Sequence, residues 1–243
     1  MRNKFIISFT PALFACLAFV FSSIAQQEDF LAGYWAFEEG SGKVVVDQSG
    51  KGNDGKINGD VKWVNGKFGK ALEFAPGANV EIPDSPSLRD MDSYTVALWI
   101  NFNEFSPDWN HIFEKDGSYG LTVNTATGDF RFTPNSSKVW LESKYKVKEK
   151  TWYYIAMTAE SSGITFYVDG KKQADAKEPI VYTKNVINIA HGPSYKVNGI
   201  IDEVKFWAKA LTPDDINIAM KGNVSVSHTK EKIIDTWGKI KSN

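Results

Sequence analysis

The segment DQSGKGNDG, residues 47–55, has the residue types that bind a hard metal ion. Asp47 offers a carboxylate and Asn53 an amide oxygen, and glycines such as Gly52 let backbone carbonyls turn inward; these are oxygen ligands that Ca²⁺ takes. The spacing is not that of an EF-hand, because Lys51 stands at the fifth position of such a loop, where an oxygen ligand is needed. The segment is therefore either a calcium loop or a turn in which Asp47 and Asn53 only hydrogen-bond their own backbone.

A second group of residues has the chemistry of a sugar-binding site, in which flat aromatic rings lie beside a few polar groups. Trp109 stands in FSPDWNH, a Pro-containing loop, with Asp108, Asn110 and His111 beside it. Trp140 alternates with apolar neighbours in KVWLES, so one face of this segment meets water or a covering loop. These five residues are the ligand-binding candidates; the alternative for each Trp is a place in the core or an anchor for a loop.

The other tryptophans have different surroundings in the sequence. Trp63, in VKWVNGK, is a weaker candidate for a ligand contact. Trp35, Trp99, Trp152 and Trp207 lie in strongly apolar segments, and we assign them to the core. Aromatic residues make up 14% of the chain, which argues for a packed domain rather than a disordered one.

The elements that must position these residues are short β-strands, because apolar and polar residues alternate with a period of two along most of the chain. These segments are rich in Val, Ile, Thr and aromatic residues, and they include YTVALWINF, GLTVNT, DFRFT, KVWLES, WYYIAMTAE, ITFYVDG and IIDEVKFW. Asp169-Gly170, between TFYV and KKQAD, predicts a tight hairpin. About twelve to fourteen such strands, with no helical period between them, predict an all-β antiparallel β-sandwich or jelly roll in a single domain.

Helical signals appear only near the C-terminus. Residues 212–215, Thr-Pro-Asp-Asp, supply a Thr cap, Pro at the first helical position and Asp three residues after the cap, and Gly222 with Asn223 ends the segment. From about residue 228 to residue 241, large apolar residues recur at helical spacing. We expect residues 223–243 to form a short C-terminal helical tail, which either docks on the domain or serves in attachment.

The first 25 residues have the pattern of a secretory signal peptide: a basic start, an apolar run and Ser23-Ile24-Ala25 before the cleavage point. Retention as an anchor, or lipidation at Cys16, are the alternatives. Cleavage removes Cys16, the only cysteine, and leaves 26 basic against 29 acidic side chains, a net charge of −3. We expect no nucleic-acid partner, because there is no basic excess, and no later apolar run is long enough to span a membrane.

Several short motifs stand in an order that resembles a known family: LAGYWAFEEGSG, DQSGKGNDG, GKALEF, YTVALWINF, WYYIAMTAESSGITFYVDGK and IIDEVKFWAKALTPDDI. Together they resemble the laminin-G-like jelly-roll domains of the concanavalin A-like lectin/glucanase superfamily, over about residues 30–222. The resemblance implies the jelly-roll fold. It does not by itself predict a function, because binding modules, glycoside hydrolases and polysaccharide lyases share this fold.

The resemblance also bears on the metal. Jelly rolls of this kind often carry one structural calcium that ties the early loop to the first and last strands. On that pattern, Asp47 and Asn53 would contribute side chains, the backbone near Gly52 would contribute carbonyl oxygens, and Asp202 in IIDEV would contribute from the closing strand, with Glu38 as a weaker candidate. We expect a structural Ca²⁺ held by these five residues.

Catalytic patterns of the family are missing. A retaining glucanase needs two carboxylates about 5 Å apart at the sugar bond, and the nearest match, Glu114 with Asp116, lacks the final acid and runs into an Asp-Gly turn. His111 and Glu114 lie three apart on an expected strand, so they should face opposite ways and make a poor metal pair. The acidic run from Asp84 to Asp92 predicts a solvated loop.

We therefore expect a signal peptide at residues 1–25, a laminin-G-like domain at residues 26–222 and a tail at residues 223–243. The expected function is an exported, non-catalytic binding module, secreted, periplasmic or at the cell surface, that recognises a glycan or an extracellular protein. The competing hypothesis is a glycoside hydrolase or polysaccharide lyase with a non-standard active site.

Overall fold

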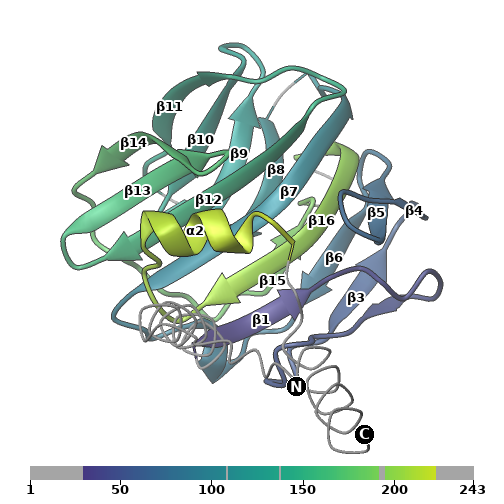
Figure 1. Cartoon of the computed structure of the whole chain (residues 1–243), viewed down its shortest axis with the longest axis horizontal. Helices are drawn as coiled ribbons and strands as arrows, with labels where there is room; N and C mark the ends of the chain where they lie inside the picture. The colour runs from purple at the N-terminus through teal and green to yellow at the C-terminus, as the bar shows by residue number, and fades with distance from the viewer. Residues whose placement is uncertain (1–29, 108, 137, 192–194, 223–243) are drawn as a thin grey trace, which may run out of the picture. The chain divides into compact units, whose positions relative to one another are not determined.

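Two antiparallel β-sheets make up the protein in the computed structural model, which describes residues 30–107, 109–136, 138–191 and 195–222 (Figure 1). Sheet A has the order β14 (Lys171–Ala176), β13 (Gly163–Val168), β12 (Trp152–Glu160), β7 (Tyr94–Glu104), β16 (Asn198–Trp207), β5 (Lys70–Phe74) and β4 (Val61–Asn65), and β1 (Leu31–Trp35) also pairs with β16. Sheet B has the order β11 (Leu141–Lys146), β10 (Asp129–Thr133), β9 (Gly120–Asn124), β8 (Trp109–Lys115), β15 (Ile187–Ile189), β6 (Asn79–Ile82), β3 (Gly55–Asn58) and β2 (Val44–Val45). The expected all-β sandwich is confirmed, with a few more strands than the alternation suggested.

The core lies between the two sheets, because every long strand presents one apolar face inward. Val96, Leu98 and Ile100 of β7 are fully buried there, and Phe113 of β8 and Phe130 of β10 face them from sheet B. The described residues from 31 onward belong to one compact unit, residues 31–223. Residues 1–25 and the whole of the expected tail, residues 223–243, lie outside the described part of the chain.

A short helix, α2 (Pro213–Ala219), covers the outer face of sheet A (Figure 1). Its N-terminus has the expected capping box, in which the Thr212 hydroxyl accepts from the amide of Asp215 and the Asp215 carboxylate accepts from the amide of Thr212. Ile216 packs on Trp99 and Trp207. These two tryptophans are therefore buried as expected, but under the helix rather than between the sheets.

Two local predictions have different outcomes. The hairpin at Asp169-Gly170 is confirmed, with positive φ angles of 50° and 73° between β13 and β14, as a primed two-residue turn requires. The run from Asp84 to Asp92 is not simply a solvated loop. It contains a 3₁₀ helix, η1 (Pro86–Leu88), whose Leu88 is fully buried.

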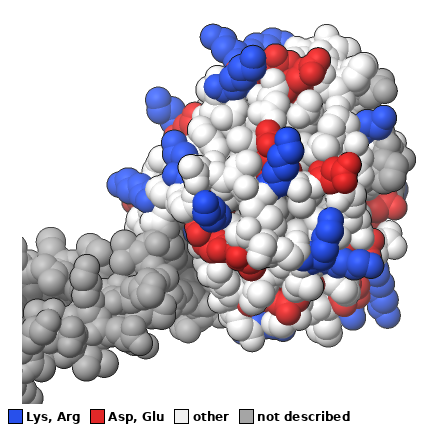
Figure 2. Space-filling model, turned by 90° about the vertical axis from the view of Figure 1, so that its right-hand side faces the viewer, with Lys and Arg blue, Asp and Glu red and all other residues white. Residues whose placement is uncertain are grey.

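The surface carries charges of both signs. Figure 2 shows acidic and basic side chains interspersed over the face that it presents, as the formal net charge of −1 suggests. No helix of the described residues is long and apolar enough to span a membrane.

Candidate ligand-binding cavity

A β-bulge in β8 sets the geometry of the candidate site. His111 pairs with Thr122 of β9 and Phe113 pairs with Leu121, so Ile112 is an extra residue and the register shifts between His111 and Phe113. A bulge moves the following side chains to the opposite face relative to a regular strand. His111 and Glu114 therefore lie on the same face, and the Nδ1 atom of His111 contacts Glu114 Oε2. The expectation that these two side chains face opposite ways is wrong for this reason.

A cavity of about 800 Å³ opens on this face of sheet B, away from the core. Its size is within the range of small-molecule sites. Strand β8, the loop before β11 and the segments on either side of β15 all contribute, and the lining residues are Trp109, His111, Glu114, Asp116, Ser136, Trp140, Lys184, Asn185, Val186, Asn188, His191 and Tyr195.

Aromatic rings form one wall of the cavity. Trp109 and Trp140 lie with ring centroids 6.0 Å apart at 44°, and both are half-buried. Trp140 approaches β9 closely because Gly120 stands there: a Cβ on this glycine would lie 2.7 Å from the Trp140 ring. Tyr195 is exposed and stacks on the His111 ring, with centroids 4.2 Å apart and an interplanar angle of 9°. The cavity thus offers flat apolar surfaces next to polar groups.

Glu114 is the buried charge at the centre of the polar part. His111 contacts its Oε2 atom, and His191 Nε2 lies 3.5 Å from the same oxygen. Burial alone would raise the pKa of Glu114, but the hydrogen bond and charge of His111, together with the charge of His191 and a hydrogen bond with Ser136, lower it below the usual value. The carboxylate is therefore ionised and held between two imidazoles.

Three of the five predicted ligand-binding residues meet in this cavity: Trp109, His111 and Trp140. Asn110 does not line it. This side chain is fully buried. Its Oδ1 atom accepts from the backbone amide of Ser106 at 3.1 Å, and its Nδ2 atom donates to the Ser106 carbonyl at 3.3 Å, so Asn110 holds the preceding loop in place. Asp108 lies outside the described residues.

Sequence reasoning missed Glu114, His191 and Tyr195 as partners of His111. The only local signal is the pair His111 and Glu114, which a regular strand would place on opposite faces. His191 and Tyr195 follow the C-terminal end of β15. The amide of His191 donates to the His111 carbonyl at 3.0 Å and so holds this segment beside β8. That contact joins segments eighty positions apart, and no sequence pattern marks it.

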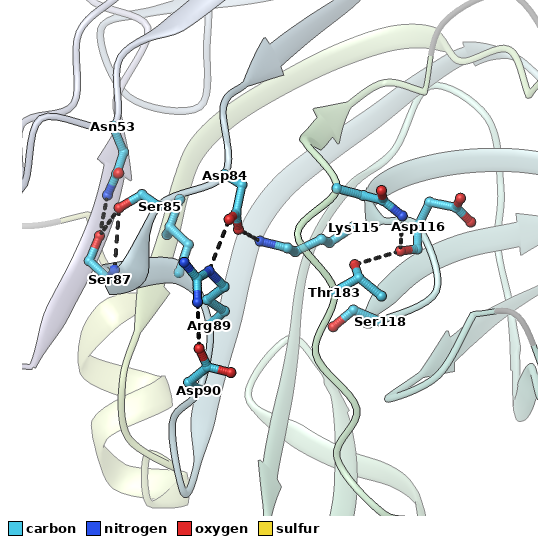
Figure 3. A network of polar contacts seen from close by, with 12 residues as sticks. Asn53, Asp84, Ser85, Ser87, Arg89, Asp90, Lys115, Asp116, Ser118 and Thr183 are labelled. Carbon is cyan, nitrogen blue, oxygen red and sulfur yellow. Dashed lines mark hydrogen bonds and ion pairs between the residues drawn. The ribbon is translucent and has the colours of Figure 1, made fainter.

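A network of ion pairs and hydrogen bonds supports β8 from the other side (Figure 3). Lys115, fully buried, binds Asp84 Oδ1 at 2.5 Å, and Arg89 binds the second oxygen of Asp84 at 2.9 Å. Burial opposes ionisation of Asp84, but its hydrogen bonds with Lys115 and Arg89 lower its pKa. Lys115, the residue after Glu114, is therefore a buried cation whose charge is paired with Asp84.

The predicted metal ligands do not gather in one place. Both carboxylate oxygens of Asp47 accept backbone amides: Oδ1 from Tyr34 and Ser49, and Oδ2 from Asn53, each at 2.9 Å. The Asn53 amide donates to the Ala32 carbonyl at 2.7 Å. This is the geometry of the turn hypothesis, in which Asp47 and Asn53 organise their own loop.

Asp202 and Glu38 lie elsewhere, and each accepts a backbone amide of the segment formed by residues 66–70. The Phe68 amide donates to Asp202 Oδ2 at 3.0 Å, and the Lys70 amide donates to Glu38 Oε1 at 3.1 Å. Gly69, with φ of 52°, leaves room for the Glu38 carboxylate, which a Cβ there would strike. Among the described residues, no group of three or more His, Cys, Asp or Glu side chains is arranged to hold a metal.

A bound cation would stabilise the buried carboxylate of Asp202. Its Oδ1 atom is buried and has no hydrogen-bond partner within the described part of the chain. Burial, opposed by the Phe68 amide and reinforced by the charge of Glu203, raises the pKa of Asp202 to about 7. Asp202 is therefore a better candidate to bind a cation than Asp47, Gly52 or Asn53, and the structural Ca²⁺ stays a prediction.

The comparison of the sequence with protein families decides the relationship. A family model described as the concanavalin A-like lectin/glucanases superfamily matches residues 74–217, more than half of the chain. The chain belongs to this superfamily. A comparison with curated protein sequences gave no match.

Solved structures share the fold. Domain 4 of AbnA, an extracellular arabinanase from Geobacillus stearothermophilus, solved in complex with arabinotriose, is 20% identical with a TM-score of 0.66, and the match covers 78% of this chain and 98% of that one. The binding domain of botulinum neurotoxin DC, solved with rat synaptotagmin II, is 16% identical with a TM-score of 0.64, and the match covers 79% of this chain and 51% of that one. The binding domain of Paraclostridial Mosquitocidal Protein 1 is 13% identical with a TM-score of 0.65, covering 79% and 52%. This superfamily member thus spans about half of the toxin domains that it matches.

Proposed function

We propose that this protein is an exported, non-catalytic glycan-binding module whose ligand lies in the cavity on sheet B. The observation that carries the proposal is the pair of half-buried rings, Trp109 and Trp140, beside the polar groups of the same cavity. Indole faces stack on the CH groups of a sugar ring, while side chains such as Asn188 bond its hydroxyls. Export is proposed from the signal pattern of residues 1–25.

The structural comparisons support this proposal without deciding it. The arabinanase domain was solved with a bound arabino-oligosaccharide, and the toxin domain was solved with a protein. Both kinds of ligand are therefore compatible with the fold. The aromatic cavity favours the glycan, because a protein partner is usually recognised over a wider, flatter surface.

Titration of the pure protein with a panel of plant and bacterial oligosaccharides, arabinotriose included, tests the proposal. Trp109→Ala and Trp140→Ala should each weaken binding about tenfold or more, since buried aromatic anchors dominate such sites. Trp152→Ala, the same change at a half-buried Trp on sheet A, is the matched control and should leave affinity unchanged. Retained affinity in both cavity variants, or binding of proteins alone, would contradict a glycan site here.

An enzyme is the second candidate, and the contact between His111 and Glu114 is the observation that favours it. A carboxylate that orients an imidazole is a common arrangement for proton transfer. A glycoside hydrolase, however, needs a carboxylic acid with a raised pKa to protonate the leaving oxygen, and the pKa of Glu114 is lowered. Release of reducing ends or unsaturated products from any polysaccharide by the pure protein, lost in Glu114→Gln, would establish catalysis instead.

A further inference from the structure

Five acidic or basic side chains line the cavity. Glu114 and Asp116 are acidic, Lys184 is basic, and His111 and His191 are imidazoles, the side-chain type whose charge ordinarily depends on pH in this range. With neutral imidazoles the five groups sum to −1, and with both imidazoles protonated they sum to +1. The sign of the charge in the cavity thus depends on the two histidines.

Glu114 cannot buffer this change by taking up a proton itself. Burial would raise its pKa, but His111 and His191 lower it, so the carboxylate stays ionised. Histidine is the side chain whose charge ordinarily changes between about pH 5 and pH 8. Acidification therefore adds positive charge on the cavity wall and leaves the negative charge of Glu114 in place.

The charged side chains on the neighbouring strands of sheet B are of both signs. Arg131 of β10 lies on the same face, two strands from His111, and it is bound to Asp129 at 3.3 Å and to Glu142 at 3.0 Å. On the other side, Glu81 of β6 and Lys56 of β3 face each other in register, beyond Asn188 of β15. None of these neighbours is an imidazole, the side-chain type whose charge ordinarily changes between about pH 5 and pH 8.

His191 is the more exposed of the two histidines. Its side chain is 23% exposed, whereas the His111 ring is covered by Tyr195. The Nδ1 atom of His191 is buried and has no hydrogen-bond partner in the described part of the chain, while Nε2 faces Glu114, so a charge on this ring would act on a ligand across the cavity wall. Lys184, exposed on the same cavity, adds a basic side chain to the same wall.

We propose that the cavity prefers acidic sugar units and that this preference strengthens on acidification through His111 and His191. The inference rests on the proposed glycan-binding function and adds the class of ligand. A sugar carboxylate resembles Asp in acidity and stays ionised at pH 5. It therefore meets a cavity of opposite sign at pH 5 and of the same sign at pH 8.

Trigalacturonate and its methyl-esterified form test the inference, because they differ in charge and share a skeleton. Calorimetry at pH 5 and pH 8 should show trigalacturonate binding about tenfold more tightly at pH 5, with little change for the ester. His191→Gln should remove most of this pH dependence. Lys184→Gln should weaken trigalacturonate at both pH values and keep the pH dependence.

Lys172→Gln, at an exposed residue of β14 in sheet A, is the matched control and should behave as the wild type. A neutral glycan that binds well with no added affinity for any acidic one at pH 5 would overturn this inference and leave the proposed function standing. An unchanged pH dependence in His191→Gln combined with His111→Gln would also overturn it. Failure of every glycan to bind would instead remove the proposed function.

Discussion

His111 and Glu114 contact each other although three positions separate them on one strand, because β8 carries an extra residue at Ile112. The bulge rotates the strand so that both side chains point into the cavity, and the backbone of His111 at the bulge also accepts the amide of His191. Bulges are frequent near functional sites because they redirect a side chain without breaking the sheet. The chemistry of the cavity depends on this irregularity.

Replacing Glu114 with Gln should destabilise the protein in a pH-dependent way. A carboxyl with a lowered folded-state pKa contributes stability above its unfolded pKa, and this contribution is lost as the pH falls through the folded-state pKa. We expect Glu114→Gln to lower the free energy of unfolding by about 2 kcal/mol at pH 7, with the deficit vanishing in strong acid. Urea unfolding at several pH values measures this. Glu81→Gln, at an exposed residue on the same face, is the control, and an equal pH-independent loss in both variants would contradict the interpretation.

Asp202 should have the opposite pH dependence in the absence of divalent metal. Its folded-state pKa of about 7 exceeds the ordinary value of 3.8, so the folded protein holds a proton that the unfolded chain has released between these pH values. Stability should therefore fall as the pH rises through that window, by up to about 4 kcal/mol. In EDTA, Asp202→Asn should raise the melting temperature at pH 8 and change it little at pH 4. A lower melting temperature for the variant at pH 8 in EDTA would contradict this account.

Calcium should separate the two groups of predicted ligands. Ca²⁺ at a hundred times its dissociation constant should add about 2.7 kcal/mol, seen as a higher melting temperature than in EDTA. From the geometry at the turn of residues 66–70, Asp202→Ala should abolish this calcium shift. Asp47→Ala should lower the melting temperature equally with and without calcium, because it removes three amide hydrogen bonds. The reverse pattern would place the ion in the loop of residues 47–55. If calcium does not change the melting temperature of the wild type and elemental analysis finds no calcium, the site does not exist.

Gly120 should control ligand binding without touching the ligand. A Cβ at this position would lie 2.7 Å from the Trp140 ring and must displace it. We therefore expect Gly120→Ala to weaken glycan binding several-fold while changing the melting temperature little. In a Trp140→Ala background the same change should have no further effect on affinity, which a double-mutant cycle checks. Additive losses would show that Gly120 acts by another route.

The sequence by itself determined the strands, the fold class and the local turns. Alternation along YTVALWINF, the Asp169-Gly170 hairpin and the capping box before α2 depend on neighbours within a few residues, so local patterns predict them. Three of the cavity residues were also found, since Trp109 with its neighbour His111, and Trp140, had visible signatures.

Only the tertiary structure decided how these pieces meet. The bulge in β8 depends on pairing with β9 and on the contact with His191. The order of the strands places Asp47 and Asp202, the two groups of carboxylates, in different parts of the fold. Register, bulges and contacts between distant segments arise from pairing across the sheet, which alternation along one strand does not encode. For that reason the residue types of the site were visible in the sequence, and its geometry was not.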